Sequence, residues 1–277
     1  MTVPGPVLAR VAEQLGHVAA VRGALLDRDA LPGLSRLALV RQISKDLAAC
    51  SLVSGAIQPG RIERLMRDGV DGATSRIGEK EAGAGTDGFV RGLLGQDRIN
   101  ARLLLHAVIN GHGLFFAQCL AVVSGMPLEK IFTLLENGAR VALNALFRQC
   151  GMDGAQSSLL ARLVLFARSC DLASDWASRH YVVGALIEEL IIEHDGDIPE
   201  CLEEIFHYLD EQNLVLARAA ARGVMPCFSQ LAGQERVLPV ADRELSNVAL
   251  GRELERQAQM RDPQVTGASG QLVLPAA

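Results

Sequence analysis

The sequence is poor in aromatic residues and in lysine. Only 4% of the 277 residues are aromatic, whereas 49% are hydrophobic, and the hydrophobic residues are mainly Leu, Ala and Val. This composition is typical of packed helices, because strands are rich in aromatic and β-branched side chains. Lysine occurs only at Lys45, Lys80 and Lys130. We attribute the preference for arginine to a GC-rich genome.

Several sequence signals of location and partner class are also missing. The six cysteines are scattered and form no Cys-x-x-Cys pair, which fits a reducing compartment. Arg10 and Glu13 interrupt the N-terminal apolar residues before a signal peptide is formed, and no run reaches the 18 apolar residues of a membrane span. The net charge of −5 argues against duplex DNA or an anionic membrane as the main partner. We therefore predict a soluble, cytoplasmic protein.

Residues 101–150 contain four short helical patterns, each closed by glycine or proline. Their apolar residues recur at spacings of three and four, which places them on one helix face. A tight turn is expected at 110–113, a left-handed helix end at Gly125 and a helix start at Pro127. Residues 114–124 are apolar nearly all round, so we expect that helix to be central and buried.

Helical patterns continue on both sides of this block, and we expect residues 78–88 to form a flexible connection in which Thr86 or Asp87 caps the next helix. The other expected helices are a weak one at 6–28, one from Ser35 to near Gly55, one from Pro59 to about Ile77, and longer ones at about 155–170, 175–194 and 198–224, the last broken near Asn213. After Pro226 the pattern decays. We expect an exposed helix at 242–260 and a disordered tail at 261–277, and only residues 271–274 alternate as a strand would.

The pattern predicts an all-α protein of about ten helices arranged as antiparallel helical hairpins. Because the period is irregular, a repeat or solenoid-like stack and a compact bundle are both compatible with it. We divide the chain into an N-terminal helix at 1–30, a helical-hairpin domain at 31–225 and a polar, partly disordered C-terminal extension at 226–277.

A family resemblance lies in residues 103–127. They read Leu-Leu-Leu-His-Ala-Val-Ile-Asn-Gly-His-Gly-Leu-Phe-Phe-Ala-Gln-Cys-Leu-Ala-Val-Val-Ser-Gly-Met-Pro. With the helical spacing that follows, this segment resembles the alphaproteobacterial family called domain of unknown function 2336, mainly its C-terminal part. The resemblance covers roughly residues 30–220 and rests on packing signals. It implies an all-α, repeat-like fold with a regulatory or interaction role, and it brings no catalytic residues.

Two motifs that bind cofactors or metals elsewhere lack the context they need. Residues 83–88 match Gly-x-Gly-x-x-Gly, but residues 76–81 before them do not form the strand that a dinucleotide site requires. Glu204 and His207 have the spacing used by di-iron bundles, but there is no second Glu-x-x-His. We expect a loop and a solvated helix face, with a metal at Glu204 and His207 as the remote alternative, and we predict no cofactor.

Residues 188–211 hold ten acidic residues and no Lys or Arg. The apolar residues between them keep helical spacing, so the acidic side chains share an outer face. Such a face is commonly just solvated, and docking against a basic surface of a partner or a second subunit is the sharper alternative. A matching basic surface is expected at Arg61, Arg64, Arg67 and Arg76. The acidic candidates for partner binding are Glu193, Asp195, Asp197, Glu200, Glu203 and Glu204.

No catalytic site can be assembled from the remaining patterns. His112 lies between two glycines, where we expect it to be exposed, and it is a further candidate for partner binding; His106 is expected to be a structural histidine with its hydrogen bond satisfied. There is no Gly-x-Ser-x-Gly, no phosphate loop, no Cys-His pair and no basic patch with interleaved aromatic residues.

We therefore predict a non-enzymatic helical interaction module, a regulatory adaptor that binds a protein partner or a second copy of itself, and neither nucleic acid nor membrane. The alternative is a sensor of a small ligand or metal, with a pocket between helices near 102–112 or 188–207.

Overall fold

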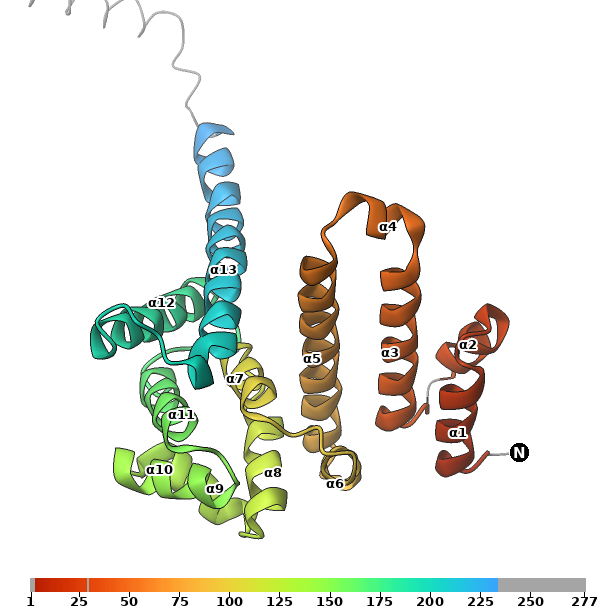
Figure 1. The fold of residues 1–277 in the computed structure, drawn as a ribbon, viewed down its shortest axis with the longest axis horizontal. Coiled ribbons are helices and arrows are strands. Elements are labelled where there is room, and N and C mark those ends of the chain that lie inside the picture. Colours follow the sequence, from red (N-terminus) through yellow and green to blue (C-terminus); the bar gives the residue numbers. More distant parts are fainter. Residues whose placement is uncertain (1–2, 29, 234–277) are drawn as a thin grey trace, which may run out of the picture. The chain divides into compact units, whose positions relative to one another are not determined.

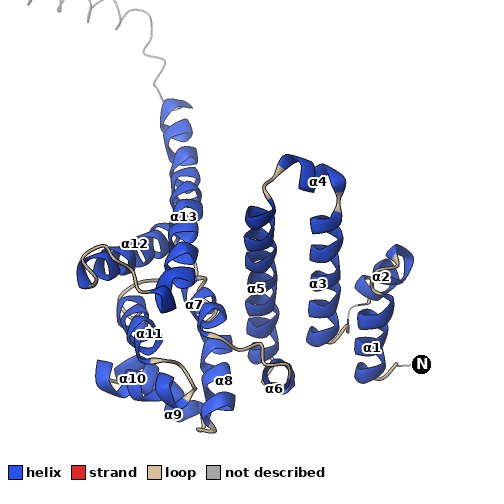
Figure 2. Cartoon of the chain, viewed as in Figure 1, coloured by secondary structure: helices blue, strands red, loops and turns tan. Residues whose placement is uncertain are grey.

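A computed structural model describes residues 3–28 and 30–233 of the chain. Contacts divide the chain into two units, Met1–Val224 and Met225–Ala277, and the following description concerns the first. The described residues form thirteen helices and no strand (Figures 1 and 2). The helices are α1 (Gly5–Leu15), α2 (Ala19–Leu26), α3 (Gly33–Ala49), α4 (Ser51–Ala56), α5 (Pro59–Gly83), α6 (Gly88–Gly95), α7 (Ala101–Ile109), α8 (Gly113–Ser124), α9 (Leu128–Asn137), α10 (Arg140–Gln149), α11 (Gly154–Ala167), α12 (Trp176–Glu193) and α13 (Glu200–Gly233).

The all-α prediction is confirmed, with more helices than the ten expected. The segment 6–28 forms two helices separated after Leu15, and the helix expected up to Gly55 is divided because Cys50 has an extended backbone (φ −69°, ψ 126°). The expectations for 242–260, 261–277 and 271–274 lie outside the described residues.

The prediction of a flexible connection at 78–88 is wrong for its first half. Helix α5 continues to Gly83, and only residues 84–87 separate it from α6. The reason is tertiary packing: Gly78 is buried, and a Cβ built on it would lie 2.1 Å from Cδ2 of Phe115 in α8. Glycine at this position therefore allows α5 and α8 to approach closely. Asp87 occupies the N-cap position of α6, but its carboxylate binds Arg91 instead of the backbone.

The expected break near Asn213 is also absent. Helix α13 continues through this residue, whose side chain lies against Gly184 of α12. Asparagine is a poor helix former in isolation, but Leu209 and Leu216 on either side of it are buried in the core and keep this part of α13 helical.

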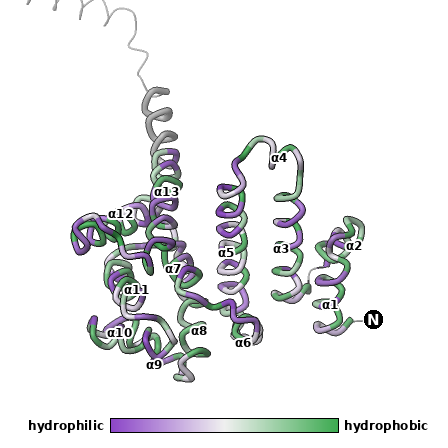
Figure 3. The backbone as a smooth tube through the Cα atoms, viewed as in Figure 1, coloured by the Kyte–Doolittle hydropathy of each residue, from purple (hydrophilic) through white to green (hydrophobic). Residues whose placement is uncertain are grey.

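The four helices expected in residues 101–150 are confirmed as α7 to α10. Gly111 and Gly125 both have positive φ values, of 74° and 70°, as the turn and helix-end signals predicted. Residues 115–120 of α8 are buried, whereas Gly113 and Leu114 at its start are exposed, and Figure 3 shows this helix as hydrophobic along most of its length.

The main core surrounds α7 and α8. Phe115, Phe116 and Phe147 are buried in it together with leucines of α7, α11 and α13. Helix α7 packs against α5, α8, α11 and α12, which is the packing of a bundle, whereas α3 packs against α1 on one side and against α5 on the other (Figure 1). A second, smaller cluster joins α1, α2 and α3.

Among the described residues, no single helix is both long and apolar enough to cross a membrane. Helices α8 and α9 together satisfy the length and composition test, but they are bent by 118° at the break between them.

The close approach of α5 and α8 gives a prediction for Gly78. The variant Gly78→Ala places a methyl group inside the Phe115 ring, so we expect a loss of about 2 kcal/mol in the free energy of unfolding. The matched control is Gly69→Ala in the same helix, where nothing lies within 4 Å of a new Cβ. Alanine there should stabilise by about 0.5–1 kcal/mol through helix propensity. Urea denaturation measures both, and equal effects of the two variants would contradict the packing described.

Candidate functional site

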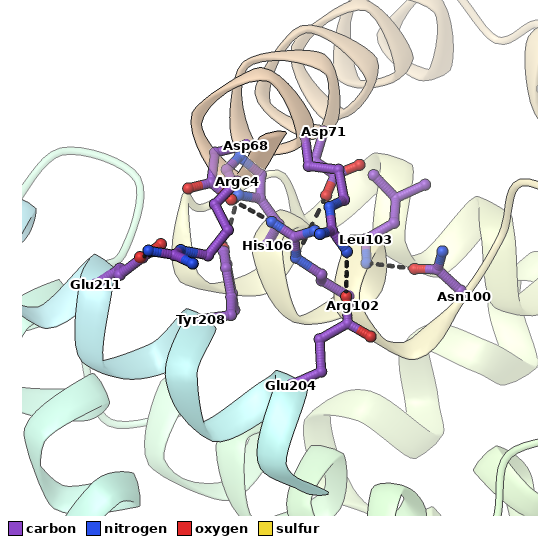
Figure 4. A network of polar contacts seen from close by, with 11 residues as sticks. Arg64, Asp68, Asp71, Asn100, Arg102, Leu103, His106, Glu204, Tyr208 and Glu211 are labelled. Carbon is purple, nitrogen blue, oxygen red and sulfur yellow. Dashed lines mark hydrogen bonds and ion pairs between the residues drawn. The ribbon is translucent and has the colours of Figure 1, made fainter. Parts of the chain in front are cut away.

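Charged side chains of α5, α7 and α13 meet at one place in the fold (Figure 4). Ion pairs, hydrogen bonds and a cation–π contact connect them. We call this cluster the charged junction; its members are Arg64, Arg67, Asp68 and Asp71 of α5, Arg102 and His106 of α7, and Glu204, Tyr208 and Glu211 of α13. Helical periodicity explains the grouping, because residues three, four and seven apart share one face of a helix.

Arg102 occupies the centre of the charged junction. Its guanidinium forms an ion pair with Asp68 and lies 3.7 Å from the carboxylate of Asp71. It also lies 5.1 Å from the centre of the Tyr208 ring, in a cation–π contact. Only 12% of the Arg102 side chain is exposed. This residue thus connects α7 with both α5 and α13.

His106 and Tyr208 form the buried side of the junction. The His106 Nδ1 and the Tyr208 hydroxyl share a hydrogen bond of 2.7 Å. Burial lowers the pKa of His106 to about 4, and the nearby charges of His112, Arg102 and Arg76 act in the same direction. The neutral ring is therefore the form present at neutral pH. The prediction that His106 is a structural histidine with a satisfied hydrogen bond is confirmed.

The two aspartates of the junction are held partly out of water. Burial raises the pKa of Asp71 from 3.8 to about 6, although the charge of Arg102 opposes this rise. Burial also raises the pKa of Asp68, again against the effect of Arg102. Asp71 therefore changes its protonation state in mild acid, and its raised pKa favours the folded state over the unfolded state as the pH falls.

Two exposed ion pairs form the outer side of the junction. Arg64 binds Glu211 and Arg67 binds Glu204, each with an N–O distance of 2.7 Å. Because these pairs face solvent, each contributes between 0 and about 1 kcal/mol. Exposed pairs of this kind form and break readily.

The other acidic candidates have different environments. Glu193 forms an ion pair with Arg162 of α11, and Glu203 lies 3.8 Å from His207 on its own helix. The candidates Asp195, Asp197 and Glu200 are exposed and form no ion pair with any described residue. The structure thus brings Glu204, Arg64 and Arg67 together; Glu200 lines the same cavity as they do without an ion pair, and Asp195 and Asp197 lie in the turn between α12 and α13. Arg61 and Arg76 are exposed on α5.

His112 is half-buried, so the expectation that it is exposed is wrong. The positive φ of Gly111 lets the backbone at Leu172 and Ala173 cover the turn, where a Cβ on Gly111 would lie 2.5 Å from the Leu172 carbonyl oxygen. Burial lowers the pKa of His112, with Arg76 and Arg179 contributing. Its Nδ1 is buried and has no hydrogen-bond partner among the described residues.

Neither cofactor motif gains support from its surroundings. The carboxylate of Glu204 forms an ion pair with Arg67, and His207 lies beside Glu203 instead. In the part of the chain that the structure describes, no group of three His, Cys, Asp or Glu side chains is placed to hold a metal ion. The Gly-x-Gly-x-x-Gly segment 83–88 follows a helix rather than a strand.

Two cavities adjoin the charged junction. One of about 320 Å³ lies between Arg64, Arg67 and the acidic face of α13. The other, of about 780 Å³, is bounded by α3, α5, α7, α11 and α13 and includes Arg41, Lys45 and Arg98. Sequence reasoning missed these three residues because helical periodicity does not show which distant helices meet. Arg102 had a visible signal: it is the one charged residue of the short apolar helix α7.

Comparison with known proteins places the chain in a family. Residues 3–190 match the model of the bacterial family described as "Uncharacterised protein conserved in bacteria (DUF2336)". The chain belongs to this family. The match includes the N-terminal helices, which the sequence analysis treated separately, and it ends within α12. It therefore includes the α5 and α7 residues of the charged junction, whereas the α13 residues lie beyond it. No curated protein and no solved structure matches the chain.

The raised pKa of Asp71 predicts a pH-dependent effect of Asp71→Asn. The folded state binds a proton at Asp71 more tightly than the unfolded state does, so this stabilisation is present below about pH 4 and is lost as the pH rises through about 6. We expect the unfolding free energy of wild type, relative to Asp71→Asn, to fall by about 2 kcal/mol from about pH 4 to about pH 7. Any contribution of His106 is present in both proteins and cancels.

Urea denaturation of both proteins across this pH range measures the difference. The exposed Asp210 of α13, changed to Asn, controls for the loss of one carboxylate. A pH-independent difference between wild type and Asp71→Asn would show that Asp71 is not held out of water as described.

Proposed function

We propose that this protein is a non-enzymatic helical module that acts in the cytoplasm as a regulatory adaptor and binds a protein partner with a basic surface. The single observation that supports this proposal most is the turn between α12 and α13. Exposed acidic and exposed apolar side chains follow one another closely in the chain there. We call this surface the acidic turn, and it consists of Ile191, Ile192, Asp195, Asp197 and Glu200.

The exposed isoleucines are the unusual feature of the acidic turn. Ile192 is 75% exposed, and Ile191 next to it is exposed as well. An exposed aliphatic anchor surrounded by charged side chains is the arrangement found at protein interfaces, where a small apolar centre is buried and a polar rim stays wet. A partner that covers Ile192 would therefore gain hydrophobic contact area.

The acidic side chains of the acidic turn would orient the partner and select one with a basic surface. Asp195, Asp197 and Glu200 have no cation partner among the described residues, and residues 188–211 contain no Lys or Arg. Their charge attracts a basic surface over a distance of about one Debye length and repels an acidic one. Arg64 and Arg67 are paired within the chain, so only part of the arginine surface of α5 is free to bind the acidic turn of a second copy.

A photo-crosslinking amino acid at Ile192 tests this proposal in the bacterial host. The matched control is Val141 of α10, an aliphatic residue that is 80% exposed and lies outside the acidic turn. We expect one discrete protein adduct from position 192 and none from position 141. The change Asp195→Asn/Asp197→Asn/Glu200→Gln should reduce this adduct several-fold, since it removes the attraction without altering side-chain size.

The mass of the adduct identifies the partner class, and an adduct of twice the chain mass would assign the partner to a second copy. Identical adducts from both positions, or an adduct that the triple substitution does not reduce, would refute the acidic turn as the partner surface.

A further inference from the structure

The larger cavity next to the charged junction has an unbalanced charge. Its lining combines three acidic side chains, Glu63, Asp71 and Glu204, with a larger set of basic ones. The basic side chains are Arg41, Lys45, Arg67, Arg98 and Arg102. We call this cavity of about 780 Å³ the basic cavity. Its volume lies in the range of small-molecule sites.

Ion pairs within the fold account for only two of the basic side chains. Arg67 is paired with Glu204, and Arg102 with Asp68 and Asp71. Neither Lys45 nor Arg98 forms an ion pair with any residue in the described ranges. Two cations of the lining therefore have no anion in the described part of the fold.

Arg41 is the most constrained cation of the lining. It donates a hydrogen bond of 3.1 Å to the neutral side chain of Gln96, and its Nε is buried without a partner among the described residues. Burial lowers the pKa of Arg41, the charge of Arg98 lowers it further, and Glu13 of α1 acts in the opposite direction. Arg41 and Arg98 are therefore like charges gathered at one side of the cavity. An anion between them would remove their mutual repulsion and accept hydrogen bonds from their guanidinium groups.

The start of α7 adds further positive potential. Asn100, Ala101 and Arg102 line the cavity, and the Asn100 side chain accepts the N–H of Leu103 at 2.9 Å. The backbone N–H groups of Ala101 and Arg102 come before the first intrahelical hydrogen bond, so they have no acceptor within the helix. The positive end of the α7 dipole lies at this same N-terminus.

The remaining lining is partly apolar, through Met66, Val70 and Ile205. A cavity of this size holds more than a single oxyanion, and these side chains suit an uncharged organic group. Glu63 is exposed and is the one lining carboxylate without a cation partner among the described residues. Three cations of the lining, Arg41, Lys45 and Arg98, have no carboxylate partner in the described part of the chain, whereas Glu63 is the one carboxylate there without a cation partner. The cavity therefore carries a net positive charge.

We infer that the basic cavity binds a small organic phosphate, with its phosphate group between Arg41, Lys45 and Arg98 and its organic part against Met66, Val70 and Ile205. Arginine suits this role because its planar guanidinium donates two parallel hydrogen bonds to phosphate oxygens. Such a ligand site goes beyond the proposed partner binding and does not depend on it.

Calorimetric titration of the full chain with three probes tests the inference. The probes are adenosine monophosphate, inorganic phosphate and adenosine, in a buffer of low ionic strength. We expect adenosine monophosphate to bind, inorganic phosphate to bind more weakly and adenosine not to bind. The affinity should fall with added sodium chloride, because salt screens the charges. The Nε–H signal of Arg41 in ¹⁵N NMR spectra should shift when the phosphate binds.

The variant Arg98→Gln separates this site from general charge effects. Arg98 is exposed, so its replacement leaves the core intact, and we expect at least a tenfold weaker affinity for adenosine monophosphate. The matched control Arg61→Gln removes an exposed arginine of α5 that does not line the cavity, and it should leave the affinity unchanged.

The outcomes decide the inference directly. Equal affinity for inorganic phosphate and adenosine monophosphate would support the anion site but overturn the organic part of the assignment. Absence of binding by both at about 10 mM, equal binding of adenosine, or equal weakening by the two arginine variants would overturn the inference as a whole.

Discussion

The contact of Arg102 with two carboxylates and one aromatic ring is the interaction on which the charged junction depends. Its partners Asp68 and Asp71 come from α5 and Tyr208 comes from α13. Removing one partner of a buried ionic group is costly, at about 3–5 kcal/mol, because the remaining charges stay in a poor solvent. By contrast, the exposed pairs Arg64–Glu211 and Arg67–Glu204 contribute little. The position of α13 over α5 and α7 therefore rests on Arg102 and on the apolar face of α13.

The basic cavity and the charged junction share four residues, Arg67, Asp71, Arg102 and Glu204. The phosphate that we infer between Arg41, Lys45 and Arg98 would add negative charge close to the guanidinium groups of Arg67 and Arg102 in the same cavity. Because Glu204 of α13 contacts α5 through Arg67, we propose that a ligand in the cavity would change how firmly this part of α13 is held.

Most of the helical architecture could be predicted from the sequence, but little of the candidate site could be. The helices of residues 101–150 were predictable because their apolar residues keep one spacing and because Gly111 and Gly125 mark the turns. The continuation of α5 through Gly78 was not predictable. A glycine is needed at this position because the ring of Phe115, a residue of another helix, lies against it. Local preference predicts a loop wherever glycines cluster, and only tertiary contact reverses it.

For the candidate site, too, the features that depend on local sequence were predictable and those that depend on tertiary contacts were not. The acidic stretch 188–211 and the arginines of α5 were visible as charged faces, and two of the expected pairings occur within the chain. The roles of Asp68, Asp71 and Tyr208 were not visible, because a charged or aromatic residue at helical spacing looks the same whether it faces water or a buried guanidinium. His112 was misjudged for a related reason: the segment that covers its turn lies about 60 residues further along the chain.

Amide hydrogen exchange of α13 in Arg102→Gln, compared with Arg64→Gln, tests most directly whether Arg102 positions this helix. The first variant leaves Asp68 and Asp71 partly buried without their cation, whereas the second removes only an exposed pair. We predict faster exchange throughout residues 202–216 in Arg102→Gln and exchange close to wild type in Arg64→Gln. Equal protection of α13 in the two variants would contradict the account.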